Sequence, residues 1–168
     1  MKAALLVIDI QKAYAADEET KRAYCEAALY INAAAELFRK RGHVIVSIYH
    51  HDRENGPHPG DPAYEFADEV KIGVPDVVIS KTHGNAFYET SLAEDLRALG
   101  TGPVLVSGFC AEHCVLDTYR GAEERGFPPL LLRGGIASRT REAVEFVERL
   151  GSLVSVGALE ALLQKDGC

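Results

Sequence analysis

The stretch Ala3-Ala4-Leu5-Leu6-Val7-Ile8-Asp9 decides the fold, because an unbroken apolar run leads directly into a carboxylate. A strand that is apolar without alternation is buried on both faces, which is typical of a parallel sheet covered by helices on both sides. The similar runs Val77-Val78-Ile79 and Val104-Leu105-Val106 are followed by Lys81 and Cys114. Since ligands bind outside the carboxyl ends of the strands in open parallel sheets, an acid, a cation and a thiol are expected at one edge.

The rest of the chain alternates strand-like runs with longer helical patterns, which indicates repeated βα units. Strands are predicted at residues 3–9, 43–49, 76–80, 103–107, 130–132 and 153–156, and helices at 20–41, from 90 or 91 to 99, from the segment around 114 to 126, 142–150 and 159–164. The sequence therefore predicts one α/β domain over residues 1–168, with a three-layer α/β/α, doubly wound, Rossmann-like fold and a six-stranded, mostly parallel sheet. Residues 50–75 hold four prolines and three glycines, and so long an irregular loop is usually functional.

Composition excludes several classes of protein. The net charge of -7 and the absence of a basic stripe argue against a nucleic-acid partner. No apolar run approaches the roughly 20 residues of a membrane span, and Met1-Lys2 leads straight into a strand without a signal peptide. The four cysteines are too irregularly spaced for a disulfide framework, so we expect reduced thiols in a cytoplasmic protein. Two of them, Cys25 and Cys168, are expected to be inert.

Each of the three reactive side chains has a functional and a structural interpretation. Cys114 at a helix N-terminus would have a lowered pKa and an oxyanion site nearby, although cysteine is also a common buried residue. Asp9 could take the thiol proton and return it to a leaving amine, or could simply form an Asx turn. Lys81 could hold Asp9 ionised, or could be a solvated surface lysine. Their coincidence at three strand ends favours the functional interpretation.

The segments around these residues are similar to a known family. In order and at similar separations, they resemble the three signature blocks of the isochorismatase-like cysteine hydrolases, and the resemblance covers nearly the whole chain. The blocks are Leu6-Val7-Ile8-Asp9-Ile10-Gln11, Lys81-Thr82-His83-Gly84-Asn85-Ala86-Phe87-Tyr88-Glu89-Thr90-Ser91-Leu92 and Gly108-Phe109-Cys110-Ala111-Glu112-His113-Cys114-Val115.

The resemblance implies a Cys–Asp–Lys triad, with Cys114 as nucleophile, Asp9 as general base and Lys81 as the charge-stabilising partner. It also implies a cis peptide bond between Phe109 and Cys110 and an oxyanion hole made by the backbone N–H groups of Cys110 and Cys114.

The resemblance also implies a substrate pocket, although this chain departs from the family's pattern near it. Tyr14, Phe87 and Gln11 are expected to bind substrate. The family's pattern differs at three places, where this chain has Ala111, Gly121 and Gly134-Gly135. None of these removes a triad member, so they bear on the pocket and its specificity.

No cofactor is expected, and zinc is the alternative to weigh. Nicotinamidases of the family hold a metal after the second strand, where this chain has His50, His51, Asp52 and His58. Imidazole and carboxylate suit zinc, but the order of the residues differs from the family's Asp-x-His arrangement, so a histidine that orients substrate is favoured over a metal site. A reversible disulfide between Cys110 and Cys114 is a further hypothesis; it predicts that dithiothreitol rescues peroxide-inactivated enzyme.

These features predict a cysteine hydrolase of a small amide or related C–N bond. The alternatives are isochorismatase-type hydrolysis of a vinyl ether and a non-catalytic member that binds a metabolite or a partner. A small-molecule substrate is the expected ligand. We also expect a homodimer or homotetramer, because symmetric homo-oligomers are common and a second subunit could complete the pocket.

Overall fold

A single parallel sheet organises the computed structural model, which describes residues 2–52 and 54–163. Every pair of neighbouring strands is parallel, in the order β3-β2-β1-β4-β5-β6. The strands are β1 (Lys2–Ile8), β2 (Val44–His50), β3 (Val77–Lys81), β4 (Thr101–Gly108), β5 (Pro129–Ile136) and β6 (Leu153–Val154). The predicted α/β class and parallel sheet are confirmed.

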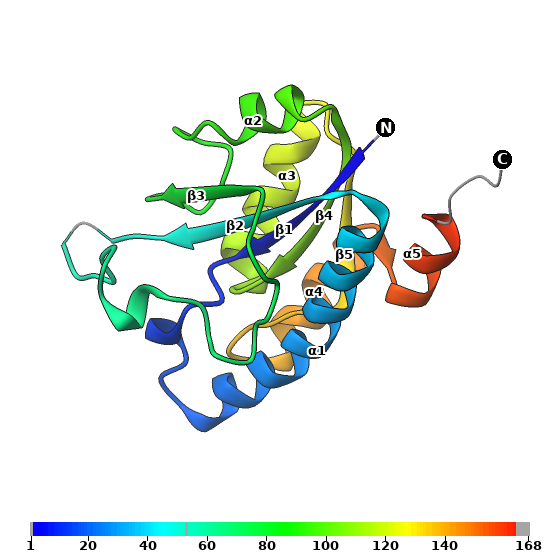
Figure 1. Ribbon diagram of the computed structural model, residues 1–168. Coiled ribbons are helices and arrows are strands. Elements are labelled where there is room, and N and C mark those ends of the chain that lie inside the picture. The colour runs from blue at the N-terminus through cyan, green and yellow to red at the C-terminus, as the bar shows by residue number, and fades with distance from the viewer. Residues whose placement is uncertain (1, 53, 164–168) are drawn as a thin grey trace, which may run out of the picture.

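Helices cover both faces of the sheet and make the outer two layers. They are α1 (Glu18–Arg41), α2 (Leu92–Ala98), α3 (Leu116–Glu124), α4 (Arg141–Leu150) and α5 (Val156–Leu162), with short helical turns η1 (Lys12–Tyr14), η2 (Pro62–Tyr64) and η3 (Ala111–Val115). Side chains of α1 and α5 share one core with the sheet, while those of α2, α3 and α4 share the other. Figure 1 shows α1 on one side of the strands and α2 and α3 on the other.

The two cores follow from the alternation of side chains along the central strand. Leu5 and Val7 of β1 face the core under α1, whereas Leu6 and Ile8 face the core under α2 and α3. All four are inaccessible to solvent. A strand buried on both faces must be apolar at every position, which explains the unbroken run in the sequence.

The strand order reverses between β1 and β4, and this switch point places the site. The chain runs outward from β1 through β2 to β3, then returns to the other side of β1 with β4. At such a point the loops after the two strands diverge and leave a crevice at their carboxyl ends. Gly108 ends β4 with φ at 115°, and a β-carbon there would collide with the backbone of Ile8. Only glycine allows the two strand ends to approach so closely.

The element boundaries differ from the sequence prediction at several ends. β5 is longer than predicted, and the predicted sixth strand stops at Val154, because the Ser155 hydroxyl accepts a hydrogen bond from the N–H of Ala158 and begins α5 there. α1 begins at Glu18, two residues before the prediction, because the Asp17 carboxylate accepts a hydrogen bond from the N–H of Thr20. The predicted end of the last helix, Gln164, and the predicted inert Cys168 lie outside the described residues.

The long segment between β2 and β3 folds back against the sheet. It carries η2, and the rings of Tyr64 and Phe66 stack on Tyr49 of β2, with ring centroids 5.1 Å and 4.3 Å away. No described helix is both long enough and apolar enough to cross a membrane.

Candidate active site

Asp9 is the first residue after β1 and is almost fully buried, at 2% exposure. Its φ of 49° lies in the left-handed region, which non-glycine residues adopt seldom and aspartate more readily than most. The Nζ of Lys81, at the end of β3, donates a hydrogen bond to Asp9 Oδ2 at 2.5 Å. A carboxylate at the end of an apolar strand therefore has a buried cation as its partner.

The Lys81 ammonium has an acceptor for each of its three protons. Besides Asp9, its neighbours are the backbone carbonyl of His83 at 3.0 Å and the Nδ1 of His50 at 3.3 Å. Because an ammonium only donates, Nδ1 of His50 accepts and its Nε2 carries the proton. Burial and, after it, the charge of Lys81 together lower the pKa of His50 to about 4, so this imidazole is neutral at pH 7.

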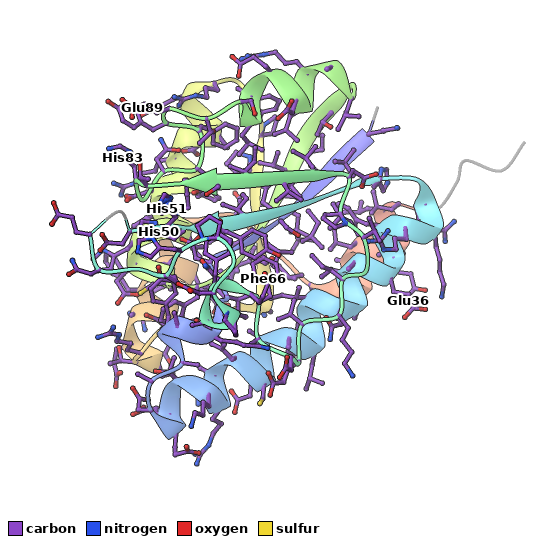
Figure 2. All side chains as sticks on the ribbon, turned by 60° about the vertical axis from the view of Figure 1, so that its left-hand side comes forward. Glu36, His50, His51, Phe66, His83 and Glu89 are labelled. Atoms are coloured by element: carbon purple, nitrogen blue, oxygen red, sulfur yellow. The ribbon has the colours of Figure 1, made fainter. Side chains whose placement is uncertain are left out.

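Cys114 completes the group. Its sulfur, an Asp9 carboxylate oxygen and a His50 ring nitrogen all lie within 4.8 Å of one another. The structure thus brings together the three residues of the expected triad, from the ends of β1 and β3 and from the turn after β4. Figure 2 shows His50 at the end of β2, beside His51 and close to His83.

The expected lowered pKa of the Cys114 thiol is wrong for the ligand-free protein. Burial and, after it, the negative charge of Asp9 together raise the pKa of this thiol to about 12. The residue order predicts Cys114 at a helix N-terminus, but it is the fourth residue of the π-helical turn η3, and α3 begins only at Leu116. The thiol is therefore protonated at neutral pH.

The carboxylate of Asp9 has one oxygen to spare. Oδ2 accepts from Lys81, whereas Oδ1 is buried without a hydrogen-bond partner among the described residues. Burial raises the pKa of Asp9, and the positive charge of Lys81 opposes this shift. An unpartnered carboxylate oxygen near a protonated thiol is the arrangement that a general base requires.

The turn that carries Cys114 begins with a second thiol. The peptide bond between Phe109 and Cys110 is cis, as the resemblance implied. Within the described chain, the N–H of Cys110 donates no hydrogen bond, and that of Cys114 donates none outside the η3 turn. The N–H of Cys110 therefore has no partner in the described chain, and the oxyanion hole stays a prediction. The two thiols are free, and burial raises the pKa of Cys110 to about 11.

A cavity of about 440 Å³ opens over these groups. That volume is within the usual range for sites that bind small molecules. Tyr14 lines it as expected, and the Tyr14 hydroxyl is buried without a hydrogen-bond partner among the described residues. The lining residues are Asp9, Tyr14, His50, Asp52, Gly56, Phe109, Cys110, Glu112, His113, Cys114 and Arg139.

Two of the expected substrate-binding residues do not line this cavity. Phe87 is buried in the core beneath α2 and α3, where its ring stacks on Phe127 with centroids 5.7 Å apart. Gln11 is fully buried, and its side-chain amide bonds to the backbone of His50 and Tyr64. The residue order does not give the direction of these two side chains, and their role in substrate binding stays a prediction that the cavity lining does not support.

The histidines and the aspartate after β2 do not converge on a zinc site. The rings of His51 and His58 pack edge to face at 5.7 Å, and Asp52 accepts hydrogen bonds from the N–H groups of Glu54 and Asn55. Among the described residues, the grouping with metal-ligand spacing is the one formed by Asp9, His50 and Cys114.

The position of Lys81 argues against a cation in that grouping. Its ammonium lies 2.5 Å from Asp9 Oδ2 and 3.3 Å from His50 Nδ1, where its charge would repel a metal ion. The donor set therefore does not fit a zinc site.

Sequence reasoning did not identify two charged residues of the cavity, Glu112 and Arg139. Glu112 lies inside the signature block that contains Cys114, and Arg139 follows the buried end of β5. The signal available for Arg139 was its position after a predicted strand, the same signal that identified Asp9.

The strand order and the side chains at its switch point define a doubly wound α/β protein with a potential nucleophile and base in one cavity and a buried cation bonded to the base. A family model described as the isochorismatase domain matches residues 3–150. The chain therefore belongs to the isochorismatase family.

Individual relatives agree with this assignment. Over 139 residues the chain is 30% identical to the uncharacterized isochorismatase family protein YrdC of Bacillus subtilis (82% of this chain, 74% of that protein). An isochorismatase-like hydrolase from Alkaliphilus metalliredigens superposes with a TM-score of 0.87 at 21% identity (98% and 100% covered). The pyrazinamidase of Pyrococcus horikoshii, in complex with zinc, superposes with a TM-score of 0.76 at 26% identity (92% and 99% covered). Members of the family are hydrolases, amidases among them.

Proposed function

We propose that this protein hydrolyses a small amide or related C–N bond through a thioester on Cys114. The observation that carries the proposal is the buried Asp9 carboxylate, whose Oδ2 accepts from Lys81, whose Oδ1 has no partner among the described residues, and one of whose oxygens lies within 4.8 Å of the Cys114 sulfur. A carboxylate base that is paired with a cation and lies close to a thiol is what nucleophilic catalysis by cysteine needs. The similarity to a pyrazinamidase gives further support.

The first half of the reaction forms the thioester. Asp9 Oδ1 takes the thiol proton of Cys114 as the sulfur attacks the carbonyl carbon of the amide. The carbonyl oxygen becomes an oxyanion, which the N–H groups of Cys110 and Cys114 stabilise. Asp9 then gives its proton to the nitrogen, and the C–N bond breaks to release ammonia or an amine.

The second half regenerates the thiol. Asp9 takes a proton from a water molecule, whose oxygen attacks the thioester carbonyl. The C–S bond breaks, the carboxylic acid leaves, and the proton on Asp9 returns to the sulfur. Lys81 stabilises the negative charge of Asp9 whenever the carboxylate is deprotonated.

A screen of small amides with a fluorescent ammonia assay tests the proposal. Wild-type protein should turn over at least one amide, and both Cys114→Ala and Asp9→Asn should reduce kcat by at least about a thousandfold, as removal of a nucleophile or its base does elsewhere. Cys25→Ala, which removes an exposed cysteine far from the cavity lining, is the matched control and should keep full activity. Turnover that survives Cys114→Ala would show that Cys114 is not the nucleophile.

A measurement of pyruvate release distinguishes the principal alternative from amide hydrolysis. A vinyl ether hydrolase of the isochorismatase type would release pyruvate rather than ammonia, and acid catalysis of that reaction does not require Cys114. A protein that only binds a metabolite would release neither product from any substrate in the screen.

A further inference from the structure

We propose that Glu112 determines specificity in this cavity and selects amides whose acyl part carries a positively charged nitrogen, an ammonium or a guanidinium. The inference rests on the proposed function, since it names the substrate class of the same site. It starts from a carboxylate that lies two residues before Cys114, lines the cavity and takes no part in the triad.

The Glu112 carboxylate is held in place by its neighbours. Its Oε2 accepts a hydrogen bond from the hydroxyl of Ser138, a buried residue of the loop after β5, and another from the Cys110 thiol at 3.1 Å. Burial alone would raise the pKa of Glu112, but the hydrogen bonds from Ser138 and Cys110 hold it below its usual range. The carboxylate is therefore ionised at neutral pH and fixed in orientation.

The second oxygen of Glu112 has no partner on another described residue. Oε1 accepts no hydrogen bond from another described residue, and Glu112 has no ion pair with a lysine or arginine of the described chain. Oε1 is also not among the buried unpartnered atoms. An ionised carboxylate with an accessible oxygen and no counter-ion on a lysine or arginine of the described chain can form an ion pair with a cationic group of a ligand.

The remaining charges of the cavity favour the same ligand. Asp52 also lines it, and backbone N–H groups lower the pKa of that carboxylate. Arg139 is the opposing charge, but it is exposed to solvent, which screens its field. With Asp9 neutralised by Lys81, the described part of the lining holds two carboxylates and one guanidinium, and the more buried of the two carboxylates is that of Glu112.

Three amides of similar size test the inference. 4-Aminobutanamide is cationic, pentanamide is its neutral analogue, and succinamate is anionic. In the wild-type protein, kcat/KM should be at least tenfold higher for 4-aminobutanamide than for pentanamide and lowest for succinamate, because an ion pair with a hydrogen bond typically contributes a tenfold to hundredfold preference. Glu112→Gln, which can still accept from Ser138, should bring the first ratio to within threefold of one.

The control is Glu123→Gln, which removes an exposed carboxylate of α3 and should leave the ratio between the substrates unchanged. The ratio is the readout, because a merely structural effect of Glu112→Gln would lower all three rates together. Equal rates in the wild type, or a cationic preference that survives Glu112→Gln, would overturn the inference. A succinamate preference lost in Arg139→Gln would transfer the role to Arg139.

Binding separates this inference from the proposed function. Cys114→Ala should bind 4-aminobutanamide at least tenfold more tightly than pentanamide by calorimetry, and Glu112→Gln in that background should abolish the difference. If the wild type hydrolyses no amide of the wider screen but the binding preference holds, the hydrolase proposal fails and the inference stands. If amides are hydrolysed without a charge preference, the inference alone fails.

Discussion

The buried pair of Asp9 and Lys81 is the electrostatic centre of this molecule. Both side chains are nearly inaccessible, with 3% and 0% of their surface exposed. Two charges removed from water are retained only if they neutralise one another and their remaining hydrogen-bonding capacity is met. Lys81 meets this condition fully, whereas Asp9 leaves Oδ1 unpartnered near the thiol. The oxygen without a hydrogen-bond partner, Asp9 Oδ1, is thus the atom that we propose to act in catalysis.

Lys81→Met should destabilise the protein by about 3–5 kcal/mol, because it leaves the Asp9 carboxylate buried without its cation. The free energy of unfolding in urea measures this change. A matched control is Lys40→Met, which breaks an exposed ion pair of α1 with Glu36 at 2.6 Å and should cost less than about 1 kcal/mol. Figure 2 shows Glu36 on the outer side of that helix. If both variants lost the same free energy of unfolding, the interpretation that Asp9 is buried and depends on Lys81 as its partner would be wrong.

The thiol of Cys114 should react slowly with iodoacetamide at neutral pH in the ligand-free protein. Since its pKa is raised to about 12, only a very small fraction is thiolate at pH 7, and the rate should rise about tenfold per pH unit up to pH 10. Mass spectrometry of the alkylated protein follows this rate and that of the exposed Cys25, which should be labelled first at pH 7. A labelling rate of Cys114 that levels off below pH 8 would show a lowered pKa instead.

At the scale of elements, the approach of β4 to β1 decides whether the triad forms. The N–H of Phe109 donates to the carbonyl of Ile8 at 2.8 Å, and the N–H of Asp9 donates to the carbonyl of Ile48 in β2 at 2.9 Å. These bonds join the ends of β1, β2 and β4. The thiol and the carboxylate therefore meet because three strands end at the same level of the sheet.

Gly108→Ala should destabilise the fold by more than about 2 kcal/mol, since the new β-carbon would need both a φ of 115° and space occupied by the Ile8 backbone. Thermal unfolding measures the loss. Gly126→Ala is the matched control, because Gly126 has a φ of 79° and no atom within 4 Å of the place that a β-carbon would take, so only the backbone cost of about 1 kcal/mol remains. If the two variants melt at the same temperature, the close approach of β4 to β1 is not the cause of the lost stability in Gly108→Ala.

At the scale of the whole molecule, assembly stays a prediction. We propose a homodimer or homotetramer. Phe146 and Leu150 lie one turn apart on α4 and are 54% and 51% exposed, an apolar pair of the kind that subunit contacts cover. Analytical ultracentrifugation should therefore give a multiple of 18.3 kDa, and Phe146→Glu with Leu150→Glu should shift the mass towards the monomer. Sedimentation of the wild-type protein as a monomer at a concentration of tens of micromolar would contradict the predicted homo-oligomer.

Residue order alone predicts the layered architecture, because an apolar run such as residues 3–8 is stable as a strand only when helices cover both of its sides. It also located Asp9, Lys81 and Cys114 at strand ends, where a parallel sheet gathers its functional groups. Residue order carries this information, since alternation and strand polarity are properties of the chain.

Only the tertiary structure decided the electrostatic state and the walls of the cavity. Burial depends on all neighbours at once, so the raised pKa of Cys114 and the inward position of Phe87 could not be predicted from spacing. The same holds for Glu112, whose fixed carboxylate exists because the loops after β4 and β5 meet in space at Ser138. Contacts between residues distant in sequence are set by packing, and packing is what the order of residues alone does not specify.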